Sequence, residues 1–422
     1  MPGVMLIGAL KNVGALFGRT RSVPDGEPLH SLHNREMLCT QEDFHLVCFS
    51  PLALAFFLLF RFYSGTHITA NSAHMYKNTQ SFSLFVAIAA LSFSAAEVTT
   101  AAGHKVLEAE SAISANAPAV LWRKPADTGS RNLFYGPGGK DHQPRGPFTF
   151  LKEDLDGTNP KFDVRDREGV TWKVKLGEEA RPETVASRLV WAVGYSANED
   201  YFLASLRVGD MPAHLHRGQN LIAPDGTFRN VRLKRKLEAE KKIAIWQWRR
   251  NAFTGTRELN GLRVMMALIN NWDLKDVNNA IYEEKAVEGL GGPELIYDVS
   301  DLGASFGTTG RSWTRAKSKG NLRAYSHSSF ISKVTPAYVD FKTPTRPALS
   351  HVFEFPEFVS RLRLRWIGRH IPREDARWIG QLLARLSPDQ VRAAFRAAGY
   401  SAQEINGFTQ VVEARIAELN QL

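Results

Sequence analysis

The chain contains 422 residues, with 53 lysines and arginines against 43 aspartates and glutamates, which gives a formal net charge of +10 at pH 7. This excess of positive charge favours anionic partners such as nucleotides, lipid head groups or acidic polymers. Both cysteines, Cys39 and Cys48, lie near the N-terminus. The body of the chain after residue 96 has none, which excludes disulfides, thiolate catalysis and Cys-rich zinc sites there.

A pattern typical of a secretory signal peptide lies inside the chain, at residues 75–96. It starts at Met75, continues with an apolar run and ends with small residues up to Ala96. Because a signal peptide normally begins a chain, we expect translation to start at Met75 and the product to be exported to the periplasm or secreted. Residues 1–74 are then a doubtful extension. A retained N-terminal membrane anchor is the alternative.

Residues 97–145 are rich in Ala, Gly and Pro and are expected to form an irregular linker. Three short segments of strand character follow, separated by the turn signals DGTNP and EG: PFTFLKEDL, KFDVRDR and VTWKVKL. A helix is predicted next, since Pro182 suits a first helical turn and Gly194 follows the last apolar residue of the helical pattern. These elements predict a small β-rich lobe over residues 146–210.

The rest of the chain, residues 211–422, has mostly helical patterns. TRELNGLRVMMALIN, residues 256–270, has apolar residues along one stripe of a helix, and NAIYEE and ELIYDVSDLG after it predict a β-hairpin. The last helix is expected to start at Ser401, where Glu404 completes a capping box. The sequence thus predicts a two-lobed α+β fold, with a small β-rich N-lobe and a larger helical C-lobe that hold a nucleotide between them.

The sequence WKVKLGEEARPE combines a lysine at the end of a strand with carboxylates at the start of the next helix. A strand lysine that contacts phosphates needs a fixed counter-ion, and a glutamate on the packed helix can supply it. We select Lys175 and Glu183 for these two roles. Lys173 remains an alternative, because residues two apart on a strand point to the same side.

The stretch NNWDLKDVNN, at the end of the predicted helix 256–270, places Asp273, Lys275 and Asn278 as D-L-K-x-x-N. Phosphoryl transfer requires a carboxylate that orients the attacking hydroxyl, a cation near the transferred phosphate and an amide oxygen on a divalent metal. Farther along, YDVSDLGASFG has Asp301 directly after an apolar strand, where a carboxylate can coordinate Mg²⁺. A glycine two residues later is expected to let the backbone turn away.

In order, spacing and context these motifs resemble the protein-kinase-like superfamily. DLKDVN is similar to the catalytic loop and DLG to the metal-binding D-F-G motif of protein kinases, while KLGEEARPE is more similar to the lysine strand of phosphatidylinositol 3/4-kinase-like and HipA-type kinases. The resemblance implies that Lys175 contacts the α- and β-phosphates of ATP and that Glu183 braces it. It also implies that Asp273 is the catalytic carboxylate, and that Asn278 and Asp301 bind Mg²⁺.

The sequence departs from the family pattern in several places. No G-x-G-x-x-G precedes the lysine strand, and only Gly157, Thr158 and Asn159 lie in the corresponding turn, where backbone N–H groups can still bind phosphate. Trp272 replaces the arginine that protein kinases carry before the catalytic aspartate. Three neighbouring polar residues remain open as alternative ligands: Asp276, Asn279 and Asp298.

These features predict a kinase-like phosphotransferase that moves the γ-phosphate of a Mg-bound nucleoside triphosphate to a hydroxyl of an unidentified, anionic acceptor. Two alternatives remain: a pseudokinase-like module that binds a nucleotide without transfer, and a kinase-fold enzyme that transfers the nucleotidyl group. The segment from Arg311 to Lys333 carries six basic and no acidic residues, which fits either a solvated loop or a platform for an anionic substrate. Peripheral membrane contact is consistent with this charge, whereas export argues against nucleic acid as a partner.

Overall fold

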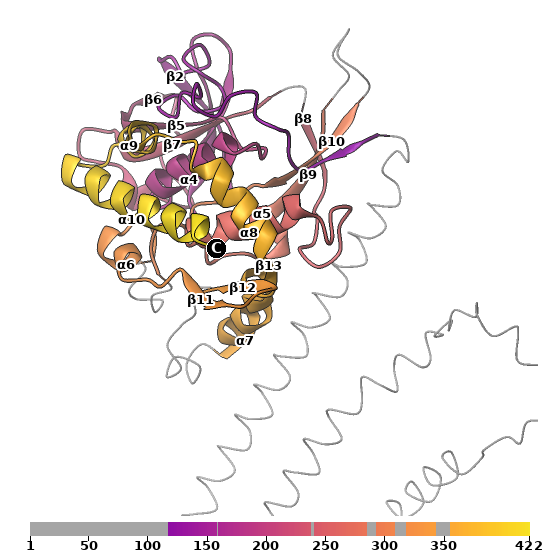
Figure 1. Ribbon diagram of the computed structural model, residues 1–422. Coiled ribbons are helices and arrows are strands. Elements are labelled where there is room, and N and C mark those ends of the chain that lie inside the picture. Colours follow the sequence, from indigo (N-terminus) through magenta and orange to yellow (C-terminus); the bar gives the residue numbers. More distant parts are fainter. Residues whose placement is uncertain (1–116, 158, 238–239, 285–292, 309–317, 343–354) are drawn as a thin grey trace, which may run out of the picture. The chain divides into compact units, whose positions relative to one another are not determined.

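The computed structural model describes residues 117–157, 159–237, 240–284, 293–308, 318–342 and 355–422 (Figure 1). The predicted signal peptide, the extension before it and Thr158 lie outside these ranges. Within them, no helix combines the length and the apolar character needed to cross a membrane. The described residues combine three β-sheets with seven α-helices, so the predicted α+β class is confirmed.

The largest sheet has six strands in the order β5-β7-β4-β3-β2-β6. Its strands are β2 (Phe148–Asp154), β3 (Lys161–Arg165), β4 (Thr171–Lys175), β5 (Asp200–Leu206), β6 (Val208–Gly209) and β7 (Phe228–Arg235). The first three are the strands predicted from the sequence, and they pair antiparallel to one another. The strand β7 lies beyond residue 210, where we expected the β-rich lobe to end, and yet it pairs with both β4 and β5.

The two faces of this sheet differ in polarity over its central strands, because side chains alternate along each strand. One face is apolar and forms a hydrophobic cluster that includes Phe162, Val174 and Leu233. The other face is charged, since Lys175 lies opposite Lys161 on one neighbouring strand and opposite Arg232 on the other. A further lysine pair, Lys173 opposite Lys234, lies on the same face.

The helix after β4, α4 (Ala180–Ala192), packs against β5, β7 and α9 (Pro388–Ala397) and is buried over most of its length. The predicted helix is therefore present, and it ends before Gly194 as expected. Gly194 has φ +105°, and a Cβ atom there would lie 2.2 Å from the carbonyl oxygen of Arg123. Only glycine fits this turn, which brings the segment around residue 123 against the end of α4.

A second sheet has the order β1-β10-β9-β8, with β1 (Ala119–Val120), β8 (Glu240–Ala244), β9 (Asn279–Glu284) and β10 (Glu294–Val299). The antiparallel pair of β9 and β10 is the predicted hairpin. It follows α5 (Arg257–Leu268), the helix predicted over residues 256–270, which Thr256 caps by accepting a hydrogen bond from the Leu259 backbone. The strand β1 comes from the segment expected to be irregular, and it pairs parallel with β10.

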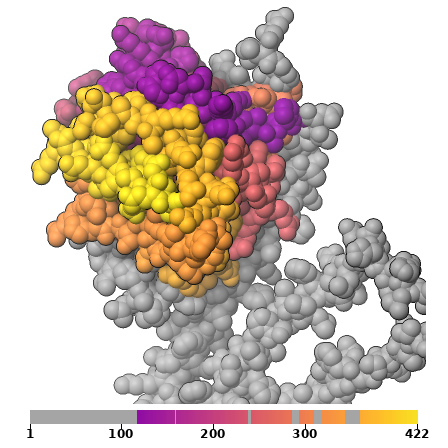
Figure 2. Space-filling view, viewed as in Figure 1, coloured from indigo at the N-terminus to yellow at the C-terminus, as the bar shows by residue number. Residues whose placement is uncertain are grey.

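The remaining elements lie in the C-terminal part of the chain. They are α6 (Leu322–Ser326), α7 (Phe355–Leu364), α8 (Arg373–Leu383), α10 (Ala402–Asn420), and a third sheet of β11 (Ile331–Val334), β12 (Tyr338–Phe341) and β13 (Ile371–Pro372). Three short 3₁₀ turns complete the described structure: Gln219–Leu221, Asp276–Asn278 and Arg365–Gly368. On the face shown in Figure 2, C-terminal residues (yellow) lie between residues from the first part of the described chain (purple) and the orange segment that holds the third sheet.

The helix α10 begins with the predicted capping box, in which Ser401 Oγ accepts from the Glu404 backbone at 3.3 Å and Glu404 Oε2 accepts from the Ser401 backbone at 2.8 Å. We expect Ser401→Ala to lower the free energy of unfolding by about 1 kcal/mol, the usual contribution of a capping side chain. Denaturant unfolding measures this loss. Gln403→Ala, at an exposed position of the same turn, is the control, and an equal loss in both variants would contradict the capping role.

Candidate functional site

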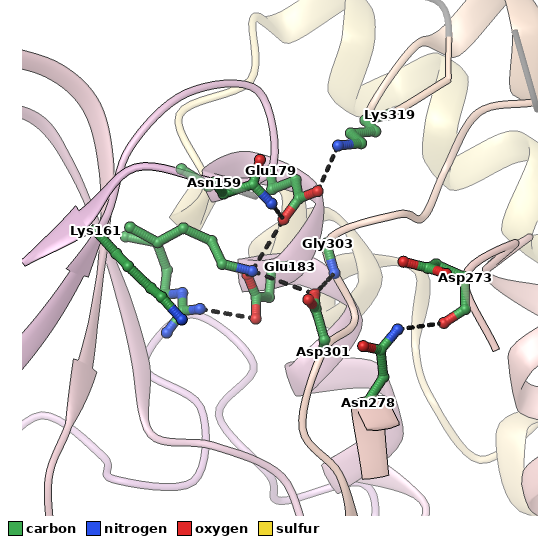
Figure 3. Close-up of polar contacts among 12 residues, drawn as sticks. Asn159, Lys161, Glu179, Glu183, Asp273, Asn278, Asp301, Gly303 and Lys319 are labelled. Atoms are coloured by element: carbon green, nitrogen blue, oxygen red, sulfur yellow. Dashed lines mark hydrogen bonds and ion pairs between the residues drawn. The ribbon is translucent and has the colours of Figure 1, made fainter. Parts of the chain in front are cut away.

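A buried lysine surrounded by carboxylates forms the centre of the candidate site (Figure 3). The ammonium of Lys175, at the end of β4, lies 2.8 Å from Glu183 Oε2, 2.9 Å from Glu179 Oε2 and 3.2 Å from Asp301 Oδ1. The residues paired in the sequence analysis, Lys175 and Glu183, are thus in contact, and Asp301 joins them from 126 residues farther along the chain. One strand, one helix and the loop after β10 meet at this ammonium.

The alternative lysine, Lys173, lies on the same face of the sheet but contacts a different partner. Its ammonium binds the carboxylate of Asp154 on β2, and Lys161 lies 3.6 Å from the same carboxylate. The side chain of Lys173 is 30% exposed, against 9% for Lys175. Of the two candidates, Lys175 is the one that contacts the helix α4.

Glu183 also binds a second cation, which the sequence analysis missed. Its Oε1 lies 2.8 Å from Arg232 Nη2, and Arg232 Nη1 lies 3.2 Å from Asp200 Oδ1. All three side chains are buried. Arg232 lies directly opposite Lys175 in the pairing of β4 with β7, so this second pair fixes α4 against the sheet. In the sequence, only the alternation of charged and apolar residues in FRNVRLKR indicates that Arg232 lies on a charged face of a strand.

Glu179 is a further residue that the sequence analysis missed. Its carboxylate accepts a hydrogen bond from Lys175, another from the Asn159 amide at 2.5 Å and a third from Lys319. Residue 303 next to Glu179 must be glycine, because a Cβ atom on residue 303 would lie 2.7 Å from the Cβ atom of Glu179. The φ of Gly303 is not in the left-handed region, so the close approach of Glu179 is what requires a glycine at this position.

The turn between β2 and β3 lies next to this centre. Asn159 reaches Glu179, as described above, and Gly157 has φ +66°. Arg217 holds the turn by donating to the carbonyl oxygens of Gly157, Asp154 and Asp156, the last two at 2.7 and 3.2 Å. The turn expected to bind phosphate is therefore fixed beside Lys175.

The loop after α5 carries the other predicted residues. Asn278 Nδ2 donates to the Asp273 carbonyl at 2.7 Å, and Lys275 Nζ lies 3.4 Å from Asp273 Oδ1. This Oδ1 atom is buried but accepts no hydrogen bond from the described residues. The loop is also joined to the end of β10, because the Ser300 backbone donates to the Asn278 carbonyl at 2.9 Å. Asn278 and Asp301 therefore lie close to each other (Figure 3).

The residues left open as alternatives have structural contacts. Asp276 Oδ1 accepts a hydrogen bond from the Trp248 backbone at 3.0 Å. Asn279 is buried and donates to the Trp246 carbonyl at 3.0 Å. Asp298 is buried within β10, with 4% of its surface exposed, whereas the side chain of Asp301 is 37% exposed. Asn278 and Asp301 are thus better placed to bind a ligand from solvent.

Two oxygen atoms in this region are suited to a divalent cation. Among the described residues, neither Asn278 Oδ1 nor Asp301 Oδ2 accepts a hydrogen bond. Amide and carboxylate oxygens are ligands that Mg²⁺ accepts. Carboxylate oxygens of Glu179, Glu183 and Asp301 also lie within 4.8 Å of one another, and the Lys175 ammonium contacts all three. Asn278 and Asp301 are therefore one candidate donor pair for a metal, beside the acidic group of Glu179, Glu183 and Asp301.

The charges of the centre stabilise one another. Burial opposes the charge of Lys175, but Glu183, Asp301 and Glu179 outweigh burial and raise its pKa above the ordinary value. Burial would raise the pKa of Glu179, but Lys175 and Lys319 lower it well below 4.5. Burial raises the pKa of Glu183, and Arg232 and Lys175 oppose that rise. Lys175 and Glu179 are both charged at neutral pH.

Trp272 connects the loop that carries Asp273 to the segments after Asp301. Its Nε1 donates to the Ser318 carbonyl at 2.9 Å, and its backbone N–H donates to the Ala304 carbonyl at 3.3 Å. The guanidinium of Arg361 lies 4.2 Å from the ring centroid. These contacts fix the loop in place.

Comparisons of the chain with family models, with curated proteins and with solved structures found no match. The interpretation of the site therefore depends on its geometry and chemistry alone.

Lys175→Met is expected to lower the free energy of unfolding by about 3 kcal/mol, because it leaves buried carboxylates without their shared cation. Lys173→Met removes a more exposed pair and is expected to cost less than about 1 kcal/mol. Denaturant unfolding of both variants at neutral pH measures the difference. Equal losses would show that Lys175 is not the cation on which the centre depends.

The stability contributed by Glu179 is expected to depend on pH. Because its pKa is lower in the folded chain than its ordinary value of 4.5, the unfolded chain takes up the proton first as pH falls. The contribution is therefore fully present above pH 4.5 and decreases below it. The difference in unfolding free energy between the parent and Glu179→Gln, measured from pH 7 downward, should shrink below about pH 4.5. A difference that stays constant would contradict this assignment.

Proposed function

We propose that the chain is a Mg²⁺-dependent phosphotransferase with a two-lobed, protein-kinase-like fold, which transfers the γ-phosphate of a nucleoside triphosphate to a hydroxyl. The observation that carries the proposal is the convergence on Lys175 of Glu183 from the helix α4 and Asp301 from the loop after β10. A phosphate-binding lysine, its helix glutamate and a metal-binding aspartate are the parts that this chemistry requires. Asp273 and Asn278 lie on the adjacent loop.

Two separate hydrophobic clusters support the two-lobed arrangement. The smaller cluster consists of residues between Phe148 and Leu233 on the apolar face of the six-stranded sheet. The larger cluster gathers the helices α5, α8, α9 and α10, together with the buried side of α4. The charged face of the sheet carries Lys175 and contacts α4, so the polar centre lies between the two apolar cores.

In this proposal, Lys175 binds the phosphates of the nucleotide and the turn with Gly157 and Asn159 lies beside them. Asn278 Oδ1 and Asp301 Oδ2 would hold Mg²⁺, which supplies positive charge to the phosphates when bound. The net positive charge of the chain favours an anionic acceptor. The predicted export would place this reaction outside the cytoplasm.

Asp273 is the group proposed to act on the acceptor hydroxyl. Its buried Oδ1 accepts no hydrogen bond from the described residues, so it can accept one from a hydroxyl. During transfer, the acceptor oxygen forms a bond to the γ-phosphorus and the bond from that phosphorus to the β-γ bridging oxygen breaks. The hydroxyl proton passes to Asp273 and the nucleoside diphosphate leaves. Lys275, close to Asp273, contributes positive charge near the transferred group.

A nucleotide-binding module without transfer is the second candidate, and one observation favours it. Three donors that would face the phosphates, on Lys175, Asn159 and Lys319, all bind the Glu179 carboxylate. A phosphate group must displace that carboxylate before it can use them. In a binding module, the nucleotide would release Glu179 from these three donors, and no acceptor hydroxyl would be needed.

Incubation of the full chain with Mg²⁺ and ATP labelled separately at the α- and γ-phosphates distinguishes the candidates. Transfer of γ-label to an acceptor or to water supports the phosphotransferase. Transfer of α-label supports the nucleotidyl transferase instead. Binding of ATP, measured by calorimetry, without transfer of either label supports the binding module, and absence of both binding and transfer refutes all three.

Asp273→Ala is expected to reduce transfer by roughly 10² to 10⁴, the usual effect of removing a positioned base, while the affinity for MgATP changes only a few-fold. Asp276→Ala is the matched control from the same loop. Because Asp276 accepts a hydrogen bond from the Trp248 backbone, its loss should lower stability by about 1 kcal/mol and leave transfer near the parental rate. Transfer rate, affinity and melting temperature are measured on the same preparations. An Asp273 variant with parental transfer would remove this residue from the active site.

A further inference from the structure

A pocket of about 280 Å³ lies apart from the Lys175 centre and shares none of its residues. It is bounded by the segments around β1, the loop between α4 and β5, the end of β7, and the hairpin of β9 and β10. Four aromatic side chains line it: Trp122, Trp191, Tyr195 and Tyr282. Four cations also line it: Arg123, Arg131, Lys234 and Arg235. Three carboxylates, Glu199, Glu284 and Asp298, line it as well. The pocket therefore combines aromatic walls with a small excess of positive charge.

Two of these cations are neutralised by carboxylates. Arg123 forms an ion pair with Glu294, and Arg235 lies 3.4 Å from Glu199. Their charges are satisfied within the chain. These two arginines therefore shape the walls of the pocket and add little to its preference for an anion.

Lys234 differs from the lysine of the candidate site. Its ammonium lies 3.4 Å from Tyr282 Oη and 5.4 Å from the centroid of the Tyr282 ring. Within the described ranges, no carboxylate oxygen lies within 4.0 Å of it, whereas Lys175 has three such neighbours. Burial lowers the pKa of this ammonium, but Tyr282, Asp298 and Asp200 outweigh burial and raise it. Neither carboxylate is close enough for a direct ion pair with Lys234. An anion in the pocket would supply that direct partner.

Arg131 is the second cation without a carboxylate among the described residues. Its guanidinium donates to the Trp191 carbonyl and lies 4.4 Å from the centroid of the Trp191 ring. The arginine thus fixes one aromatic wall of the pocket and adds a positive charge beside it. Flat rings favour a planar ligand, since aromatic groups gain from stacked or edge contacts.

We propose that this pocket binds a small aromatic carboxylate, whose acid group forms an ion pair with Lys234 and whose ring packs against the aromatic walls. A volume of about 280 Å³ accommodates a single ring with its carboxylate. Tyr282 Oη also lies 3.5 Å from Ser300 Oγ, next to Asp301. A ligand at Lys234 therefore contacts the same hairpin that holds the candidate site, but its binding does not depend on the proposed transfer.

Saturation-transfer NMR on the full chain with benzoate as the probe tests the proposal. We expect benzoate to bind, and Lys234→Met to weaken binding by roughly ten-fold or more, as expected for loss of a charge-assisted hydrogen bond. Lys152→Met, at an exposed lysine on the same sheet, is the matched control and should bind as the parent does. Benzyl alcohol, which keeps the ring but lacks the charge, should bind more weakly than benzoate.

The proposal is overturned if benzoate does not bind at millimolar concentration, if benzyl alcohol binds equally well, or if the two lysine variants bind alike. Circular dichroism checks that Lys234→Met is folded. If it is not, Ala197→Leu provides the decisive measurement, since this lining position can fill the pocket without removing a charge. Loss of benzoate binding in a folded Ala197→Leu variant supports the proposal, and unchanged binding refutes it.

Discussion

The ammonium of Lys175 is the constraint on which the arrangement of the described elements depends. A buried cation is costly unless carboxylates compensate it, and here the carboxylates come from different elements. Glu179 and Glu183 belong to the start of α4, and Asp301 belongs to the loop after β10. The Lys175 ammonium therefore links the position of α4 on the sheet to the position of the loop that follows the hairpin of β9 and β10.

A second cation makes this arrangement specific. Glu183 lies between Lys175 and Arg232, and Arg232 continues to Asp200 on the edge strand β5. The alternation of β4 and β7 places both cations on the same face of the sheet, away from the apolar cluster on the other face. A rotation of α4 would separate Glu183 from both cations at once, so the helix has one favourable orientation.

The features that the sequence predicted are those that depend on local patterns. Lys175 and Glu183 are eight residues apart on a strand and the helix that follows it, and the hairpin of β9 and β10 follows from two apolar runs. Arg232 and Lys319 could not be predicted, because they reach the centre through strand register and through a loop 140 residues from Glu179. Glu179 belongs to the stretch WKVKLGEEARPE, but the sequence does not show which of the adjacent Glu178 and Glu179 contacts the lysine. Only the structure distinguishes them.

The contacts of Glu179 stabilise the centre in the absence of a ligand, and they bear on the proposed binding of a phosphate. Its carboxylate takes the donors of Lys175, Asn159 and Lys319, which are groups suited to a phosphate. These donors are therefore fixed and partly removed from water before any anion arrives, and less ordering is needed on binding. The cost is competition, because an incoming phosphate must replace an ionised carboxylate. A divalent cation at Asn278 and Asp301 would add positive charge for the incoming phosphate. It would also act on Glu179 and Lys175, since carboxylate oxygens of Glu179 and Asp301 lie within 4.8 Å of each other and Asp301 binds Lys175.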